Sequence, residues 1–258
     1  MRRAAVWVGA IAAVAMVAPL IAPYAPDALD LANRRAAPSL AHWFGTDDLG
    51  RDMFSRALFG GRVSIAIGLL SALVAVGVGV TVGAVAGYVG GWTDTLLMRA
   101  TDAVLSVPRL LLLMVAAATL QPSVPALVLI VGAVGWMETA RVSRAAVRSL
   151  LGNEFVIAAQ AAGAGHVRIL SRHLLANAAE AIRVAAVLAV GRGILIESAL
   201  SFFGVGVQPP SASWGSMLYQ AQSAMTTEPW LALFPGACIV LTVGILTAVS
   251  DAVNETGV

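Results

Sequence analysis

Long runs without a charged residue are the feature of this sequence that most restricts its fold. The longest covers residues 63–93. A helix needs about 20 mostly apolar residues to cross the roughly 30 Å of hydrocarbon in a bilayer, so each run is a candidate transmembrane helix. The composition agrees, since 59% of the residues are hydrophobic, 12% are charged and the mean hydropathy is +0.86. A soluble enzyme, a disordered protein and a nucleic-acid-binding protein are therefore disfavoured.

These runs predict an all-α polytopic membrane protein with about six transmembrane helices. The run from Leu110 to Met137 is divided in two, because residues 121–125 have the composition of a turn. The predicted spans cover residues 4–26, 63–93, 103–121, 124–140, 184–206 and 229–250. Residues 1–26 then hold the first span, residues 27–62 form a loop, and residues 63–258 form a core domain of five spans.

The first span has an alternative interpretation as a cleaved signal peptide, because Arg2 and Arg3 precede its apolar stretch. That stretch is longer than the about 7–15 residues of a typical signal peptide. We therefore expect it to remain as a transmembrane helix. Within the second span, Gly79, Gly83 and Gly87 have GxxxG spacing, which favours close packing against another helix or a partner.

The distribution of arginine predicts that both termini are cytoplasmic, because basic residues gather on the inner side of membrane proteins. With the N-terminus inside, nine arginines are cytoplasmic: Arg2, Arg3, Arg99, Arg141, Arg144, Arg148, Arg168, Arg172 and Arg183. Five arginines are in the external loop at residues 27–62: Arg34, Arg35, Arg51, Arg56 and Arg62. The segment at about residues 138–183 is then cytoplasmic.

In the external loop we expect a short amphipathic helix at the membrane surface. Thr46 or Asp47 has a side chain suited to cap it. Asp52 and Arg56 lie four residues apart, a spacing that allows an ion pair on a helix. An ordinary solvated loop helix fits the same residues equally well.

Several kinds of chemistry are disfavoured by what the sequence lacks. All sixteen basic residues are arginine, so a Walker A motif, which needs lysine, is absent and this chain does not bind ATP in that way. The single cysteine, Cys238, allows no disulfide within the chain. The histidines, His42, His166 and His173, are too dispersed to predict a metal site. We expect no bound cofactor.

Two charged residues, Arg192 and Glu197, fall inside the predicted span at 184–206. A charge there is unfavourable by at least about 3 kcal/mol unless it faces protein or water. Both are therefore candidate contacts of a transport pathway or of a partner subunit. The alternative for Arg192 is a side chain that reaches the membrane surface. After this span, Pro209 and Pro210 exclude a helix, and residues 208–214 predict an external loop near a pore mouth with Gln208 and an interfacial Trp214.

The segment after the fourth span predicts a compact cytoplasmic pair of short helices. Asn153 and Glu154 suit a helix start, Ala158 and Ala159 give the helix a smooth surface, and Gly163 ends it. A second short helix begins near His166 and carries Arg168 and Arg172. Such a smooth helix suits insertion into a groove of another protein.

This segment resembles the EAA loop of the permeases of binding-protein-dependent ABC importers. The family pattern is Glu-Ala-Ala, three residues, Gly, nine residues and Ile-x-Leu-Pro. Four positions match it: Ala158, Ala159, Gly163 and Leu175. Three depart from it, Ile157, His173 and Ala176, which leaves open how strongly the loop couples to an ATPase.

Further segments at residues 42–56, 87–102 and 197–218 are similar, in the same order, to signatures of dipeptide, oligopeptide and nickel permeases, and specifically of the C-type subunit. The resemblance implies the type I ABC importer permease fold, in a bacterial inner membrane, with the EAA loop between the fourth and fifth spans. It also implies a B-type permease, two ATPase subunits that use ATP and Mg, and an external binding protein that delivers peptides. The ATPase-docking residues would be Glu154, Ala158, Ala159, Gly163, Arg168 and Arg172.

Other functions remain open from the sequence alone. A nickel importer or an importer of another small cargo has the same architecture. A secondary transporter would need ion ligands within the membrane and usually an internal repeat, and we find no convincing repeat. A non-transporting assembly protein is also compatible with spans rich in Gly and Ala.

Overall fold

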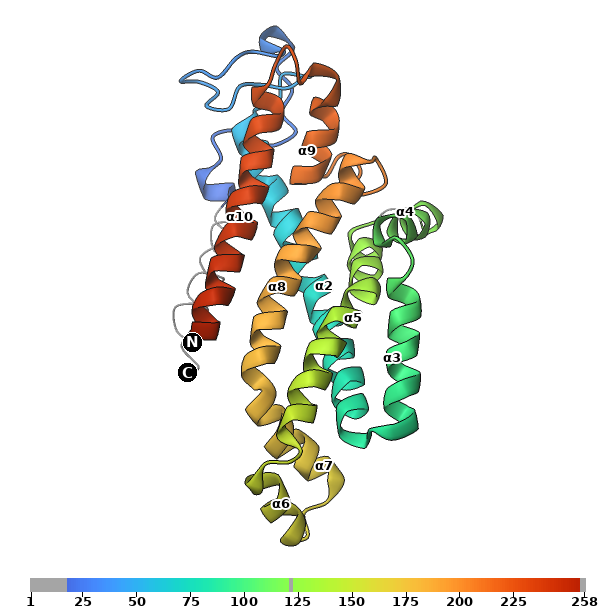
Figure 1. Ribbon diagram of the computed structural model, residues 1–258. Helices are drawn as coiled ribbons and strands as arrows, with labels where there is room; N and C mark the ends of the chain where they lie inside the picture. Colours follow the sequence, from blue (N-terminus) through green and yellow to red (C-terminus); the bar gives the residue numbers. More distant parts are fainter. Residues whose placement is uncertain (1–17, 121–122, 256–258) are drawn as a thin grey trace.

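The computed structural model describes residues 18–120 and 123–255, and this part of the chain is built from helices without a β-strand (Figure 1). The predicted first span lies largely outside the described residues. The α-helices are α2 (Met53–Val89), α3 (Gly91–Leu105), α4 (Arg109–Thr119), α5 (Val124–Leu150), α6 (Glu154–Ala161), α7 (His166–Arg168), α8 (Leu175–Phe202), α9 (Trp214–Ala221) and α10 (Trp230–Glu255). Short helices η1 (Leu31–Asn33), η2 (Ile169–Leu174, a π-helix) and η3 (Gln222–Ala224) complete them.

Within the described residues, four helices are long and apolar enough to cross a membrane: α2, α5, the continuous segment His166–Phe202 and α10. A fifth span exists if α3 and α4 are counted together. The all-α membrane fold predicted from the sequence is confirmed. In Figure 1 the long helices form one bundle, with α6 and α7 at one end and α9 at the other; we call these the α6 end and the α9 end.

Helix α2 begins at Met53, earlier than the predicted start at Val63. The separate amphipathic helix expected in the loop is absent there, because residues 53–62 are the first turns of α2. The cap is Asp52, whose carboxylate accepts from the Ser55 N–H at 2.7 Å and also contacts His42 Nδ1 at 2.9 Å. The expected ion pair of Asp52 with Arg56 is therefore wrong.

Helix α2 packs along α5 through its GxxxG residues. A side-chain carbon at Gly79, Gly83 or Gly87 would collide with the main chain of α5 near Trp136, Ala140 and Arg144. Small residues allow helix backbones to approach closely where no hydrophobic driving force exists between spans. The helix that packs against the GxxxG residues of α2 is therefore α5 of the same chain.

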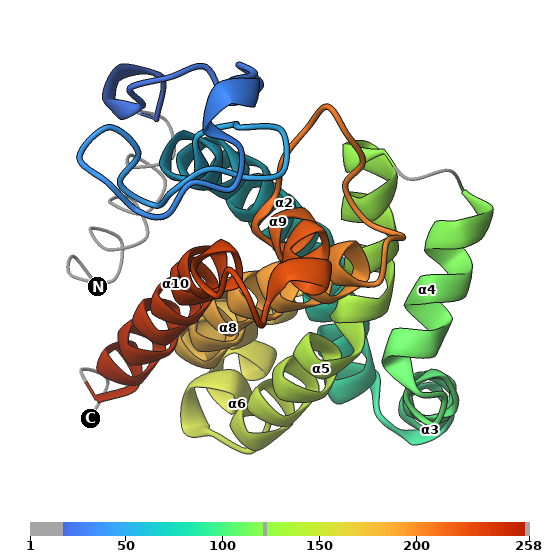
Figure 2. The same ribbon diagram turned by 90° about the horizontal axis from the view of Figure 1, so that it is seen from above.

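The predicted span at 103–121 is not one helix. Helices α3 and α4 are separate and differ in direction by 80°. Pro108, which lacks an N–H, stands at the start of α4, and the Ser106 hydroxyl donates to the Ala103 carbonyl at 2.7 Å. Figure 2 shows the bend clearly, since α3 is seen end-on and α4 lengthwise.

The fifth predicted span also has different limits. Helix α8 follows α7 and the π-helix η2 without a break, so the apolar helical segment starts at His166 and not near residue 184. Its glycine Gly193 lies against Gly68 and Ser71 of α2. Helix α10 covers α8 and α9, and a core of side chains including Met53, Ile194, Trp214, Met217 and Leu246 fills the space between them.

Candidate functional site

Helix α6 projects from the α6 end as a small knob, which we define as residues 154–168. The side chain of Val156 is buried with Val147, Ile169 and Leu174, and this contact fixes the knob to α5, η2 and α8. Glu154 and Ala158 are exposed, and Ala159 is partly exposed. The predicted alanine-rich surface is therefore present and faces away from the rest of the chain.

The turn after α6 depends on Gly163, which has φ +77°. The Gly163 N–H donates to the Gln160 carbonyl at 2.9 Å, and the Ala164 N–H donates to the Ala159 carbonyl at 3.0 Å. These two bonds form a Schellman motif, which satisfies the last carbonyls of a helix. A Cβ at Gly163 would meet nothing within 4 Å, so glycine is needed here for its conformation and not for space.

Beyond the turn, Arg168 and Arg172 are exposed and belong to α7 and η2. Helix α7 is joined to α2 by the contact of the Tyr88 hydroxyl with His166 Nδ1 at 2.7 Å. The six residues predicted for the docking loop thus lie on or beside one projection of the molecule.

The knob also exposes large apolar side chains. Phe155, Ile157 and Val167 are 36%, 55% and 82% exposed. Apolar side chains gathered on one projection are typical of a surface that contacts another protein. Ile157, one of the departures from the EAA pattern, is therefore part of this exposed surface.

The basic residues at the end of α5 are not a free solvated face. The guanidinium groups of Arg144 and Arg148 both bind the carboxylate of Asp94 in α3, the second at 2.8 Å. Arg141 pairs with Asp102 of the same helix. These contacts fix α3 against α5.

The second group of charges lies between α4, α5 and α8, about halfway along α5. The carboxylate of Glu138 contacts Arg109 at 3.0 Å through Oε1 and Arg192 at 2.5 Å through Oε2. Sequence reasoning identified Arg192 but not Glu138 or Arg109. The sequence did contain a signal for this contact. Two arginines lie within predicted spans, where an acid nearby would compensate their charge, and Glu138 directly follows the apolar part of the fourth span.

Glu197 is fully buried within the chain and does not face a pathway in this conformation. It accepts hydrogen bonds from the Ser64 hydroxyl at 2.8 Å and from the Ser201 hydroxyl at 2.7 Å. Ser64 Oγ in turn accepts from the Trp214 N–H at 3.2 Å. The carboxylate therefore connects α2 and α8 with the first turn of α9.

Residues Gln208 and Trp214 have structural contacts in the loop between α8 and α9. The Gln208 amide donates to the carbonyls of Gly204 and Gly206. Trp214 is buried and not interfacial, and its indole N–H donates to the Ala57 carbonyl at 2.8 Å. The loop is non-helical at Pro209 and Pro210, as the sequence indicated.

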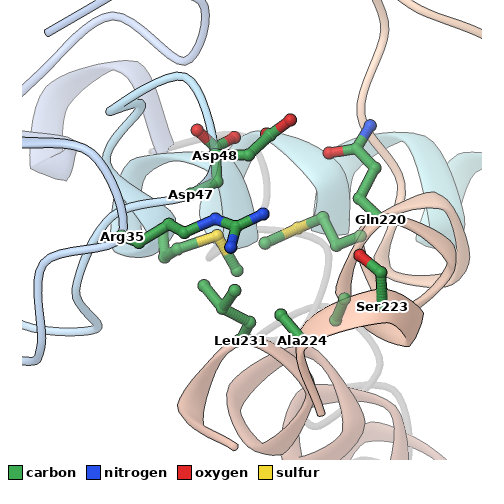
Figure 3. A pocket seen from close by; sticks show the side chains of 10 residues that line it. Arg35, Asp47, Asp48, Gln220, Ser223, Ala224 and Leu231 are labelled. Atoms are coloured by element: carbon green, nitrogen blue, oxygen red, sulfur yellow. The ribbon is translucent and has the colours of Figure 1, made fainter. Parts of the chain in front are cut away.

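At the α9 end, the segment before α2 lies beside α9 and the start of α10. Part of this segment encloses a polar pocket together with α9 and the first turns of α2 and α10, shown in Figure 3. The acid Asp47 and the amide of Gln220 line it, and buried Arg56 behind them contacts both: its NH2 group donates to Gln220 Oε1 at 3.1 Å and its Nε lies 3.6 Å from Asp47. Arg35 pairs with Glu228 at 3.6 Å at the rim. These contacts mainly hold the segment in place.

Comparison with known proteins agrees with this architecture. Residues 79–256 match the family described as the binding-protein-dependent transport system inner membrane component. The chain is similar to a glutathione transport system permease protein of Shigella flexneri, with 38% identity over 98% of this chain and 84% of the relative. It is also similar to the oligopeptide transport system permease protein of Bacillus subtilis, with 37% identity over 93% of this chain and 79% of the relative.

Proposed function

Because the chain belongs to the family of inner membrane components of binding-protein-dependent transport systems, we propose that it is the C-type permease subunit of an ATP-driven importer of peptides. Its helices line the path of the cargo together with a B-type permease. An external binding protein delivers the peptide, and two ATPase subunits use ATP and Mg on the other side. This chain itself holds no cofactor and catalyses no reaction.

The observation that carries this proposal is the knob at residues 154–168. It combines a short alanine-rich helix, an exposed apolar surface and a firm attachment to α5 and α8 through Val156. An ATPase that grips this knob moves two long helices with it. ATP binding then favours one of two packings of the same bundle. The peptide cargo rests on the relatives, one named for glutathione and one for oligopeptides.

The proposal places the α6 end in the cytoplasm and the α9 end outside, with both termini inside. This orientation is tested by cysteine labelling in a Cys238→Ser background. A thiol introduced by Ala162→Cys should react with a membrane-impermeant maleimide only after the cells are opened. A thiol introduced by Ser223→Cys, at the other end, should react in intact cells. The reverse pattern would contradict the orientation.

The function is tested with the whole transporter in proteoliposomes, with radiolabelled tri-alanine as the probe. Uptake should require the binding protein and ATP. Ala158→Trp should lower uptake at least about tenfold, because the larger side chain blocks the close approach of the ATPase, while Ala158→Ser should retain it. Uptake driven by an ion gradient without ATP would identify a secondary transporter instead, and uptake of nickel but not of the peptide would change the cargo.

A further inference from the structure

The geometry points to a binding subsite for a carboxylate of the passing cargo, formed by Arg109 and Arg192 and held in place by Glu138. The inference rests on the proposed function, since it concerns the cargo of the same path. It concerns the middle of the bundle and not the knob.

The three side chains carry an excess positive charge. Each oxygen of the Glu138 carboxylate is engaged by one guanidinium, at 3.0 Å for Arg109 and 2.5 Å for Arg192. Two guanidinium groups therefore share one carboxylate, and the group keeps one net positive charge. The group can accept one more anion.

The position of this group is deep in the bundle. Arg192 lies inside the apolar stretch at residues 184–206, and Arg109 and Arg192 line a small hollow together with Ser71 and Ala75, which lie inside the charge-free run at residues 63–93. In membrane transporters, sites near the middle of the bilayer are reached from both sides in turn. The depth is therefore suited to a cargo and unsuited to a headgroup contact.

The side chains are not covered by this chain. Arg109, Glu138 and Arg192 leave 26%, 37% and 34% of their side-chain surface exposed. A charge exposed to lipid at this depth is strongly unfavourable. Their exposed side must therefore face water or protein.

An independent feature lies at the same place. The main chain is irregular between α3 and α4 at residues 106–108, directly before Arg109. Irregular main chain occurs at membrane depth only where it is buried in protein or lines a water-filled cavity. Here it lines a pocket of about 200 Å³ together with Arg109, Val134 and Met137.

These observations favour the cargo over a permanent acid of the partner permease. The pocket is lined by Arg109 and by neither Glu138 nor Arg192, so a carboxylate in it would contact Arg109 first and reach Arg192 only at the exposed side of the group. It leaves room for the end of a peptide, and its other walls are mainly apolar, including Val104 and Leu105. Every unmodified peptide has a C-terminal carboxylate, whatever its side chains. Arginine binds carboxylates through paired N–H groups. A subsite for this common group would allow one path to serve many peptides.

The experiment compares tri-alanine with its C-terminal amide in the complete transporter in proteoliposomes. The measured quantity is the ratio of acid uptake to amide uptake, corrected for loading of the binding protein. Arg192→Gln should lower this ratio about tenfold, the effect of one hydrogen bond to a charged group. Arg192→Lys should restore much of it. Arg141→Gln, which removes the ion pair with Asp102 on the same bundle, should leave it unchanged.

A second measurement avoids the binding protein altogether. In the assembled complex in a Cys238→Ser background, tri-alanine should slow maleimide labelling of the thiol introduced by Ser106→Cys, a residue that lines the pocket. The amide should protect this thiol about tenfold less, and Arg192→Gln should remove the difference.

Each outcome has a clear meaning. If Arg192→Gln affects acid and amide equally, or leaves the ratio and the protection unchanged, the subsite is wrong. If Arg192→Gln prevents co-purification of the second permease, Arg192 pairs with that subunit and the subsite is also wrong. If the unaltered transporter takes up neither peptide, the proposed function has failed, which is distinct from a failure of the variant.

Discussion

Gly83 of α2 lies directly against the main-chain carbonyl of Ala140 of α5, with no room for a side chain between the two helices. This relationship determines how closely the two helices approach. It also places the GxxxG residues of α2 at a contact within this chain, and not at a contact with another subunit.

Gly83→Val should therefore destabilise the permease by about 1–3 kcal/mol, because added methyl groups in a packed interface force the backbones apart. Gly77→Val is the matched control, since a Cβ at Gly77 meets nothing within 4 Å. Thermal unfolding of the purified complex in detergent should show a clear decrease for Gly83→Val only. Equal midpoints for the two variants would mean that the close contact is not needed.

Gly163→Ala should impair coupling, because alanine in the left-handed region is unfavourable by about 1–2 kcal/mol. Gly165→Ala is the control, since Gly165 has a φ of −69° and equal free space around it. Stimulation of ATP hydrolysis by loaded binding protein should fall for Gly163→Ala and stay normal for Gly165→Ala. A normal response in both would show that the left-handed turn is dispensable.

Glu138→Gln should destabilise the middle of the bundle, because Arg109 and Arg192 would lose the carboxylate that they share. We expect about 2 kcal/mol, less than for a fully buried pair because the side chains are partly exposed. Adding Arg109→Gln removes one of the two charges and should recover part of the loss. A thermal-unfolding double-mutant cycle measures this coupling, and strictly additive effects would argue against the shared contact.

Glu197→Ala should destabilise the α9 end, since the hydroxyls of Ser64 and Ser201 would lose their common acceptor in a buried place. Each unsatisfied buried group is unfavourable by about 1–3 kcal/mol. Glu180→Ala, a change on the same helix at a partly exposed position, is the control. Protease sensitivity of the loop at residues 203–213 should increase for Glu197→Ala alone, and unchanged digestion would contradict the role of the network.

The parts of the fold that depend on hydropathy alone were predictable from the sequence. The start of α5 at Val124 and the extent of α10 follow the charge-free runs closely. The start of α2 does not, because the charge-free run begins only after Arg62, whereas the helix begins at Met53. Arg56 lies in this earlier part of α2 and is buried against Asp47 and Gln220. Whether a charged residue is solvated or paired depends on segments far away in the sequence.

The candidate site shows the same contrast between local sequence patterns, which were predictable, and contacts between distant segments, which were not. The alanines and glycine of the knob form a local pattern, so their arrangement was predictable from residues 154–163. The group of Arg109, Glu138 and Arg192 joins three helices, and a single sequence does not state which acid meets which arginine. Only the bend before Arg109 and the packing of α5 against α8 bring these side chains together.

Helix α5 is continuous from Val124 to Leu150, without a proline or a π-turn after its first turn. It carries Glu138 at its middle, and Val147 near its end packs with Val156 of the knob. A helix of this kind behaves as a stiff rod on the scale of a few turns. Because the knob is attached to α8 as well as to α5, a push on it carries Glu138 and Arg192 together and moves both relative to Arg109 of α4. A spectroscopic label beside Glu138 would therefore report, at a distance, when nucleotide is bound at the other end of the lever.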